Sequence, residues 1–208
     1  MKTIGQFPYC SMNLLIVCRA VLGALLLWCI LCTPVHALSR VEARGAVYDL
    51  SVKKWAAVYT PDIPWYWNKA QLKAESNFIA TADSSVGAMG LGQFMPDTWA
   101  NMQSELHFDG SAYNPSLNIQ AHAYYMSKLR GQFKTPRPEY DKHSLALASY
   151  NAGLGNILKA QKKAGNTLYW KPTGDALCYV TGKHCVETNT YVNRIWMYIK
   201  EYEGMYGN

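Results

Sequence analysis

Apolar residues recur at helical spacing through most of this chain, and no segment alternates apolar and polar residues as a strand would. The clearest case is the last segment, where Val192, Ile195 and Ile199 share one helical face. Prolines and glycines separate such segments, because proline favours the first turn of a helix and glycine its end. The pattern predicts a mainly α single domain. Helices are expected over residues 40–60, 65–75, 96–105, 114–130, 143–150, 156–164 and 190–202, and residues 76–92 and 165–188 are expected to be irregular.

The first 37 residues differ from the rest of the chain. Arg19 precedes an uncharged apolar run over residues 20–32, and a small residue, Ala37, follows at the spacing of a cleavage site. This order of basic, apolar and small residues is typical of a secretory signal peptide. The run is shorter than the about 20 residues of a membrane span. We therefore predict a cleaved signal peptide over residues 1–37; a retained membrane anchor, with membrane contact through residues 12–35, is the alternative.

The remaining residues, 38–208, are enough for one domain with an ordinary core. The chain carries a net charge of +6. A modest positive charge suits an anionic partner such as a cell wall or a membrane surface. Lys and Arg are not clustered as they are in proteins that bind nucleic acids. We expect an exported protein, periplasmic or secreted, with no nucleic-acid partner.

Two of the six cysteines, Cys178 and Cys185, lie outside the leader. An even pair in an exported domain indicates a disulfide. A zinc site needs more ligands than His184, which lies beside them. We predict a disulfide between the two and no metal site; free thiols are the expectation if the chain is not exported.

Three motifs stand out beyond these patterns. The first has two parts, A-E-S at residues 74–76 and G-A-M-G-L-G-Q-F-M-P at residues 87–96. The second is A-S-Y-N-A-G at residues 148–153, and the third is E-T-N-T-Y-V at residues 187–192. In this order and spacing they resemble the catalytic domain of the soluble lytic transglycosylases, relatives of goose-type lysozyme. The resemblance covers roughly residues 45–205.

This resemblance implies a lysozyme-like domain with a groove for glycan strands of peptidoglycan. It identifies Glu75 as the single catalytic acid and base, which cleaves the β-1,4 bond after N-acetylmuramic acid and leaves a 1,6-anhydro end, without a cofactor. The physical chemistry of the residue agrees. A carboxyl donates a proton near neutral pH only when its pKa is raised, usually by apolar surroundings. Glu75 ends a predicted helix rich in Trp and Ala.

The resemblance also implies further contacts with the substrate, and some positions depart from the family pattern. The implied substrate-binding residues are Ser84, Gln93, Met95, Tyr150, Asn151, Glu187 and Tyr191. Of these, Met95 could instead belong to the core and Glu187 could cap a helix. Gly92 stands where Met is common in the family, and His122 stands where a small residue is usual. These departures leave the details of the subsites open.

The sequence is also compatible with other functions. Most glycosidases use a second carboxylate, and Asp83, Asp97 and Glu187 are the candidates in this sequence. A hydrolytic muramidase of goose-lysozyme type would position a water molecule with the help of Asp83 or Asp97. A catalytically silent peptidoglycan-binding component of an envelope machine or a phage virion is the third alternative. The compact build favours local opening of a cell wall, with envelope-machine or virion proteins as partners.

Overall fold

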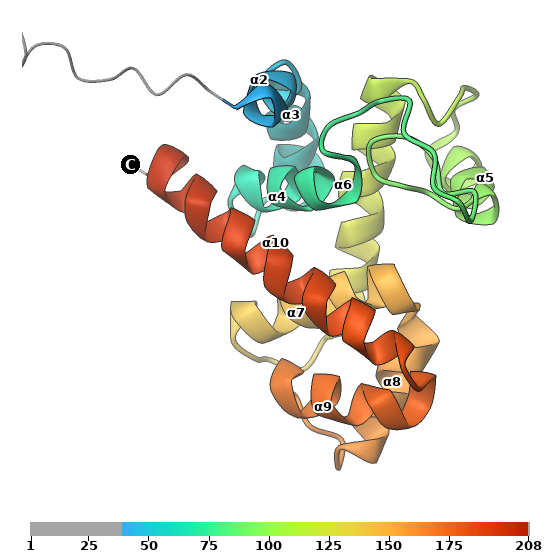
Figure 1. The fold of residues 1–208 in the computed structure, drawn as a ribbon, viewed down its shortest axis with the longest axis vertical. Helices are drawn as coiled ribbons and strands as arrows, with labels where there is room; N and C mark the ends of the chain where they lie inside the picture. Colours follow the sequence, from blue (N-terminus) through green and yellow to red (C-terminus); the bar gives the residue numbers. More distant parts are fainter. Residues whose placement is uncertain (1–38, 208) are drawn as a thin grey trace, which may run out of the picture. The chain divides into compact units, whose positions relative to one another are not determined.

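The computed structural model describes residues 39–207, which belong to one compact unit, Ser39–Asn208. The predicted signal peptide, residues 1–37, lies outside the described residues. Within them, helices alternate with loops and no sheet forms, so the predicted mainly α fold is confirmed (Figure 1). The helices are α2 (Arg40–Ala46), α3 (Asp49–Tyr59), α4 (Trp65–Ser76), α5 (Pro96–Leu106), α6 (Pro115–Gln132), α7 (Glu139–Ala152), α8 (Leu154–Lys163), α9 (Trp170–Thr181) and α10 (His184–Tyr206).

Two sequence-based predictions about helices are wrong. Residues 40–60 do not form one helix, because the chain turns more tightly where the Tyr48 N–H donates to the Gly45 carbonyl. Residues 165–188 are not irregular, because they contain α9 and the first turn of α10. Pro172 lies in the first turn of α9, where its missing N–H removes no helical hydrogen bond. Gly174 allows α9 to approach α10 closely, since a Cβ at this position would lie 2.5 Å from Asn189 Oδ1.

Helix α4 lies at the centre of the unit. It packs against α3 and α10, and most of its residues are buried. Two of these are lysines with internal partners. Lys69 Nζ donates to Asp49 Oδ1 at 2.6 Å, and Lys73 Nζ pairs with Glu42 at 2.6 Å. These ion pairs attach α3 and α2 to α4 and fix the position of its C-terminal end.

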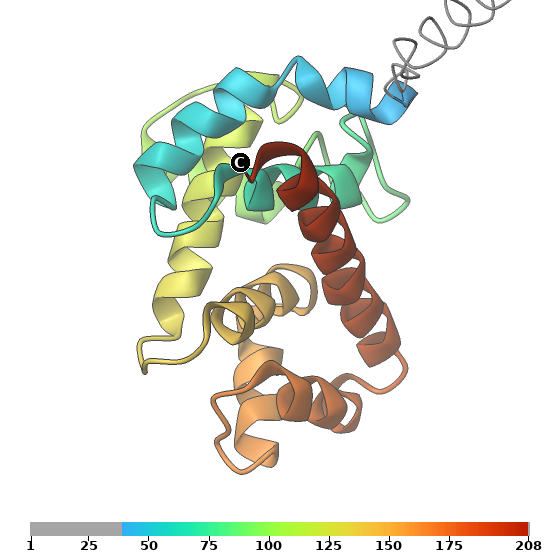
Figure 2. The ribbon, with the colours of Figure 1, turned by 90° about the vertical axis from the view of Figure 1, so that its left-hand side faces the viewer.

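Three clusters of buried apolar side chains stabilise the unit. The largest joins α4 and the C-terminal half of α6 to α7–α10, the second joins α3, α4 and the start of α6, and the third lies under α5. In Figures 1 and 2, α2 and α3 lie at one end of the unit, and α8 and α9 lie at the other. The buried members of all three clusters lie between residues 52 and 202. None of the helices in residues 39–207 combines the length and the apolar character needed to cross a bilayer.

Candidate active site

Glu75 lies in the last turn of α4, and the chain leaves this helix abruptly. Asn77 caps the helix in the left-handed conformation with φ of 49°, which asparagine tolerates better than most residues. Phe78 follows, is 1% exposed, and packs in the cluster under α3. The buried Phe78 therefore anchors the chain directly after Glu75.

A tyrosine from the last helix binds the Glu75 carboxyl. Tyr191 Oη, on α10, donates to Glu75 Oε1 at 2.5 Å. Gln71 Nε2 donates in turn to Tyr191 Oη at 3.0 Å. Gln71 and Glu75 are one helical turn apart on α4, so both side chains point to the same neighbour. The hydrogen bonds order the carboxyl through a chain from Gln71 to Tyr191 to Glu75.

The surroundings of Glu75 favour its protonated form. Enclosure by the protein is the largest influence and raises the pKa of Glu75 to about 7, while the Tyr191 hydrogen bond and the charge of Arg194 oppose this rise. Burial, helped by the charge of Glu75, holds the pKa of Tyr191 and of Tyr150 well above the ordinary value for tyrosine. Both tyrosines therefore stay protonated as hydrogen-bond donors. Glu75 itself is only partly buried, so a substrate can reach it, and it can both donate and accept a proton near neutral pH.

Tyr150 holds the glycine-rich turn before α5. Its hydroxyl donates to the Gly92 carbonyl at 2.6 Å, and the Gly92 N–H donates to Asn118 Oδ1 at 2.7 Å. Gly90 in the same turn has φ of 74°, and a Cβ there would lie 2.2 Å from the Ala112 carbonyl oxygen. The turn is thus clamped between α6 and α7, and only glycine fits at position 90.

Two of the predicted substrate-binding residues also stabilise this loop. Gln93 Nε2 donates to the carbonyls of Ala82 and Gly90, at 3.1 and 3.0 Å. Ser84 Oγ accepts from the backbone N–H of Ala88 at 2.9 Å, and among the described residues its own proton has no acceptor. Ser84 can therefore still donate to a ligand. Met95, at the end of the loop, is 44% exposed, so the alternative that it belongs to the core is wrong.

The predicted residues from α7 and α10 line two cavities. Asn151, Glu187 and Tyr191 border a cavity of about 270 Å³, together with Thr190 and Arg194. Asn151 and Glu187 also border a second cavity, of about 410 Å³, beside α8 and α9. Tyr191, which borders the first cavity, also donates its hydroxyl hydrogen bond to Glu75. The structure thus brings these three predicted residues together next to the candidate catalytic carboxyl.

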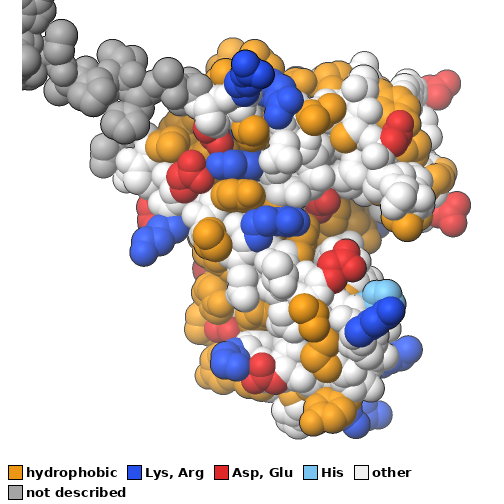
Figure 3. Space-filling view, in the orientation of Figure 1, with side chains coloured by type: hydrophobic (Ala, Val, Ile, Leu, Met, Phe, Trp, Pro, Cys, Tyr) orange, Lys and Arg blue, Asp and Glu red, His pale blue; other side chains and the backbone are white. Residues whose placement is uncertain are grey.

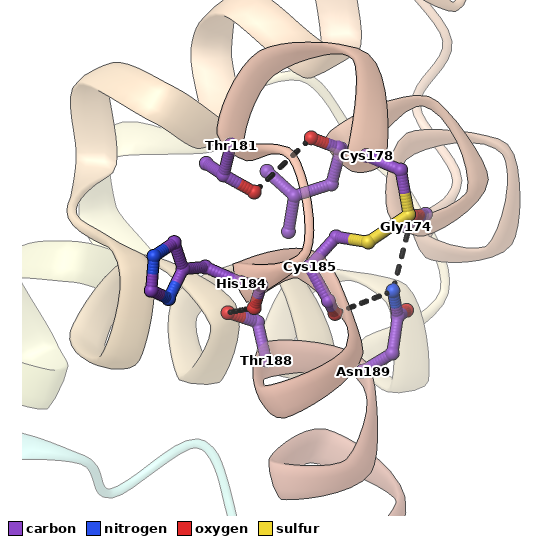
Figure 4. Close-up of a disulfide and its surroundings, with 8 residues drawn as sticks. Gly174, Cys178, Thr181, His184, Cys185, Thr188 and Asn189 are labelled. Atoms are coloured by element: carbon purple, nitrogen blue, oxygen red, sulfur yellow. Dashed lines mark hydrogen bonds between the residues drawn. A yellow bond between two sulfur atoms is a disulfide. The ribbon is translucent and has the colours of Figure 1, made fainter.

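A disulfide holds the start of α10, where Glu187 lies. Cys178 in α9 is bonded to Cys185 in the first turn of α10 (Figure 4). Asn189 Nδ2 donates to the carbonyl of Gly174, at 3.1 Å, and ties the same two helices. Thr188 Oγ1 donates across to Asn151 Oδ1, at 2.7 Å. These bonds position Glu187 at the edge of both cavities.

Sequence reasoning missed several residues of the site. Gln71 could have been found from its spacing of four residues before Glu75, and Arg194 from its spacing of three after Tyr191. The role of Asn118 was not predicted, because it depends on a turn that lies 26 residues away in sequence. Among residues 39–207, no group of three His, Cys, Asp or Glu side chains is placed to hold a metal ion.

Comparisons with known proteins show which family this chain resembles. A family model described as the transglycosylase SLT domain matches residues 56–172. The membrane-bound lytic murein transglycosylase F of Pectobacterium atrosepticum is 29% identical over 137 residues, covering 64% of this chain and 27% of that protein. The protein of the same name from Desulfosudis oleivorans is 34% identical over 102 residues, covering 49% of this chain and 21% of that protein.

Solved structures have a similar fold. The inactive mutant of the lytic transglycosylase Slt from Pseudomonas aeruginosa matches with a TM-score of 0.61 and 26% identity, covering 75% of this chain and 24% of that chain. The 70-kDa soluble lytic transglycosylase from Escherichia coli matches with a TM-score of 0.63 and 22% identity, covering 77% of this chain and 25% of that chain. These likenesses confirm the predicted lysozyme-like fold.

This chain spans about a quarter of the length of these relatives. The family match nevertheless covers more than half of this chain and includes Glu75, the glycine-rich turn and Tyr150. The resemblance inferred from the motifs is thereby confirmed, and the chain belongs to the transglycosylase SLT domain family.

Proposed function

We propose that this protein is a peptidoglycan lytic transglycosylase with Glu75 as its catalytic acid and base. It cleaves the β-1,4 bond between N-acetylmuramic acid and N-acetylglucosamine and leaves a 1,6-anhydro end. The observation that carries the proposal is the Glu75 carboxyl, whose pKa is raised to about 7 and which Tyr191 orders beside a cavity. The names of the relatives, which are lytic transglycosylases, support the same reaction.

The surroundings of Glu75 favour a mechanism with one carboxyl. A second carboxylate within a few ångströms would raise the pKa of Glu75 by charge repulsion. Within the described part of the chain, burial raises the pKa of Glu75, Tyr191 and Arg194 lower it, and no acidic residue contributes to the shift. Asp83 instead accepts a hydrogen bond from Tyr113 at 2.5 Å, and Asp97 is exposed on α5. Neither aspartate is among the groups that shift the pKa of Glu75, so we assign neither of them a catalytic role.

The reaction then needs two proton transfers through the same group. Protonated Glu75 donates to the glycosidic oxygen while the bond from that oxygen to the anomeric carbon breaks. The N-acetyl group of the same muramic sugar assists at the anomeric carbon. The resulting Glu75 carboxylate, stabilised by Tyr191 and Arg194, then takes the proton of the C6 hydroxyl of the muramic sugar. As this proton leaves, the C6 oxygen forms a bond to the anomeric carbon. The ring closes without water, and Glu75 is protonated again.

Ser84, Gln93, Met95, Asn151 and Glu187 are proposed to hold the glycan on either side of this carboxyl. Tyr150 is proposed to act mainly through the glycine-rich turn, because its hydroxyl is already bonded to the Gly92 carbonyl. Peptidoglycan is the proposed substrate. Export to the cell envelope, in the periplasm or outside the cell, follows from this substrate and from the apolar leader. Local opening of the wall, with envelope-machine or virion partners, is the proposed setting.

The test is product analysis after digestion of purified sacculi by the protein and by its Glu75→Gln variant. We expect 1,6-anhydromuramic ends from the native protein, and a loss of about 10²-fold to 10⁴-fold in rate for the variant. Circular dichroism of both proteins controls for folding. Reducing muramic ends alone would establish a hydrolytic muramidase. Binding of sacculi without any cleavage by the native protein would establish a silent binding component.

A further inference from the structure

The outward side of α3 combines apolar and basic side chains. Leu50, Lys53, Lys54, Ala57 and Val58 recur at spacings of three and four residues, and all five are exposed. Residues at this spacing share one face of a helix. The exposed face of a helix in a soluble domain is normally polar, so its two large aliphatic side chains need an explanation. Leu50 is 82% exposed and Val58 is 56% exposed.

Helix α2 extends this face. Val47, just after α2, is 74% exposed, and Arg40 and Arg44 are exposed on α2. A groove of about 570 Å³ separates this part of α2 from Ile79 and its neighbours in the turn after α4. Figure 3 shows Lys or Arg side chains among hydrophobic ones over α2. The exposed residues of α2, of α3 and of the turn between them form one surface, the α2–α3 face. It consists of Arg40, Arg44, Val47, Leu50, Lys53, Lys54, Ala57 and Val58.

The charge of the α2–α3 face is not balanced on α2 and α3 themselves. The acidic residues of these two helices are Glu42 and Asp49. Glu42 is buried and pairs with Lys73, and Asp49 pairs with the buried Lys69. Both carboxylates are therefore neutralised on the inner side. In residues 40–59, two arginines and two lysines remain on the outside without an acidic partner.

We propose that the α2–α3 face docks on the surface of an anionic lipid bilayer. Basic side chains attract anionic head groups, and aliphatic side chains enter the boundary between head groups and acyl chains. A second copy of this chain fits the face poorly, because a symmetric dimer would bring four positive charges against four. A glycan strand fits it poorly as well, since the exposed apolar side chains are aliphatic rather than the aromatic rings that stack on sugars.

The position of the face in the chain and in the fold supports the same partner. In the alternative in which the leader is retained as an anchor, the start of α2 is the part of the domain nearest to the bilayer, because the apolar run over residues 20–32 lies shortly before Arg40. The face lies at the end of the unit opposite α8 and α9 (Figure 2). The cavities bordered by Asn151 and Glu187 lie toward α8–α10. Docking by α2 and α3 leaves them accessible from the other end.

The test measures binding of the full chain, and of its compact unit Ser39–Asn208, to vesicles of stated composition. Cosedimentation is performed with vesicles of phosphatidylcholine alone and with vesicles that also contain phosphatidylglycerol. The variants are Lys53→Glu/Lys54→Glu and Leu50→Asp, and the matched control is Lys159→Glu/Lys162→Glu on α8, where both lysines are exposed. Thermal unfolding checks that each variant is folded.

We expect binding only to the anionic vesicles, weakening with salt. We expect the partition coefficient to fall at least about tenfold for the double lysine variant, and to fall also for Leu50→Asp. The α8 control keeps its binding within about twofold. An equal loss in the control would overturn the proposal, because it would show attraction by total charge alone. Absence of binding to the anionic vesicles would overturn the proposal. A dimer that Leu50→Asp abolishes would then favour a second copy, and sacculus binding that Leu50→Asp abolishes would favour a glycan.

Discussion

At the scale of single residues, the charge of Glu75 opposes the stability of the fold. The pKa of Glu75 is about 7 in the folded protein and about 4.5 in an unfolded chain. Because the folded-state pKa is above the unfolded one, protonated Glu75 contributes to the free energy of unfolding. This contribution is fully present below about pH 4.5 and is lost as the pH rises through about 7. We therefore expect Glu75→Gln to be more stable than the native protein at pH 8, by up to about 3 kcal/mol in the free energy of unfolding. The two should differ less at pH 4.5. Urea unfolding at both pH values measures this, and a difference independent of pH would contradict it.

Tyr191 acts on the same carboxyl through its hydrogen bond to Glu75 Oε1. Because this bond lowers the pKa of Glu75, we expect Tyr191→Phe to raise that pKa further. A general acid loses activity as the pH rises through its pKa, so the alkaline limb of the pH–activity profile should move to higher pH. The maximal rate should fall about tenfold to a hundredfold, as for a lost hydrogen bond to a charged group. Tyr202→Phe is the matched control, since this α10 tyrosine donates to Glu42 instead. A shifted profile in both variants would contradict a specific role of Tyr191.

Two departures from the family pattern meet at one residue, Tyr150. The His122 ring lies 5.8 Å from the Tyr150 ring, and a Cβ added to Gly92 would lie 3.2 Å from the Tyr150 hydroxyl oxygen. Position 122 thus carries a larger side chain than is usual in the family, and position 92 carries none. Both positions lie next to the same tyrosine. The sequence showed both departures but not that they are neighbours, because the residues come from α6 and from the turn before α5.

At the scale of elements, the disulfide sets the position of the first turn of α10. Cys178 and Cys185 lie 7 positions apart in the sequence, so the cross-link destabilises the unfolded state by about 2–3 kcal/mol through lost chain entropy. We expect Cys178→Ser/Cys185→Ser to lose this much stability and to cleave sacculi more slowly, because Glu187 and Thr188 lie in the turn that the bond holds. Dithiothreitol should lower the melting temperature of the native protein and leave that of the variant unchanged. Equal sensitivity of both proteins to dithiothreitol would contradict the assignment.

Helices with clear start or stop signals, such as proline in the first turn or glycine at the end, could be predicted from the sequence. Asn114 and Pro115 were expected to open a helix, and the Asn114 side chain does accept from the N–H groups of Ser116 and Leu117. The sequence did not predict α9 in residues 165–188, where Gly174 allows a close approach to α10 that depends on tertiary packing. The motifs located Glu75. They could not show that Tyr191, 116 residues away, binds it, since that contact exists only after α4 and α10 pack.

At the scale of the whole molecule, two buried histidines link stability to pH in the direction opposite to Glu75. Burial lowers the pKa of His122 to about 3, and burial with the charge of Arg130 lowers that of His143 well below its ordinary value. Neither nitrogen of the His122 ring has a partner among the described residues. The unfolded chain binds protons at both positions below about pH 6.5, whereas the folded protein does not. The histidines therefore remove stability as the pH falls below about 6.5, and ionised Glu75 removes it as the pH rises through about 7.

His122→Leu tests this balance, since leucine fills a similar volume and takes up no proton. Between pH 6 and pH 4.5, each histidine that stays neutral only in the folded state contributes a slope of about 1.4 kcal/mol per pH unit to the free energy of unfolding. We expect the variant to lose one such contribution and to resist acid better than the native protein, even if it is less stable at pH 7 through imperfect packing against Tyr150. Urea unfolding at a series of pH values gives both slopes. Parallel slopes would mean that His122 takes up its proton in the folded state, and the acid sensitivity of the fold would then have to come from other groups.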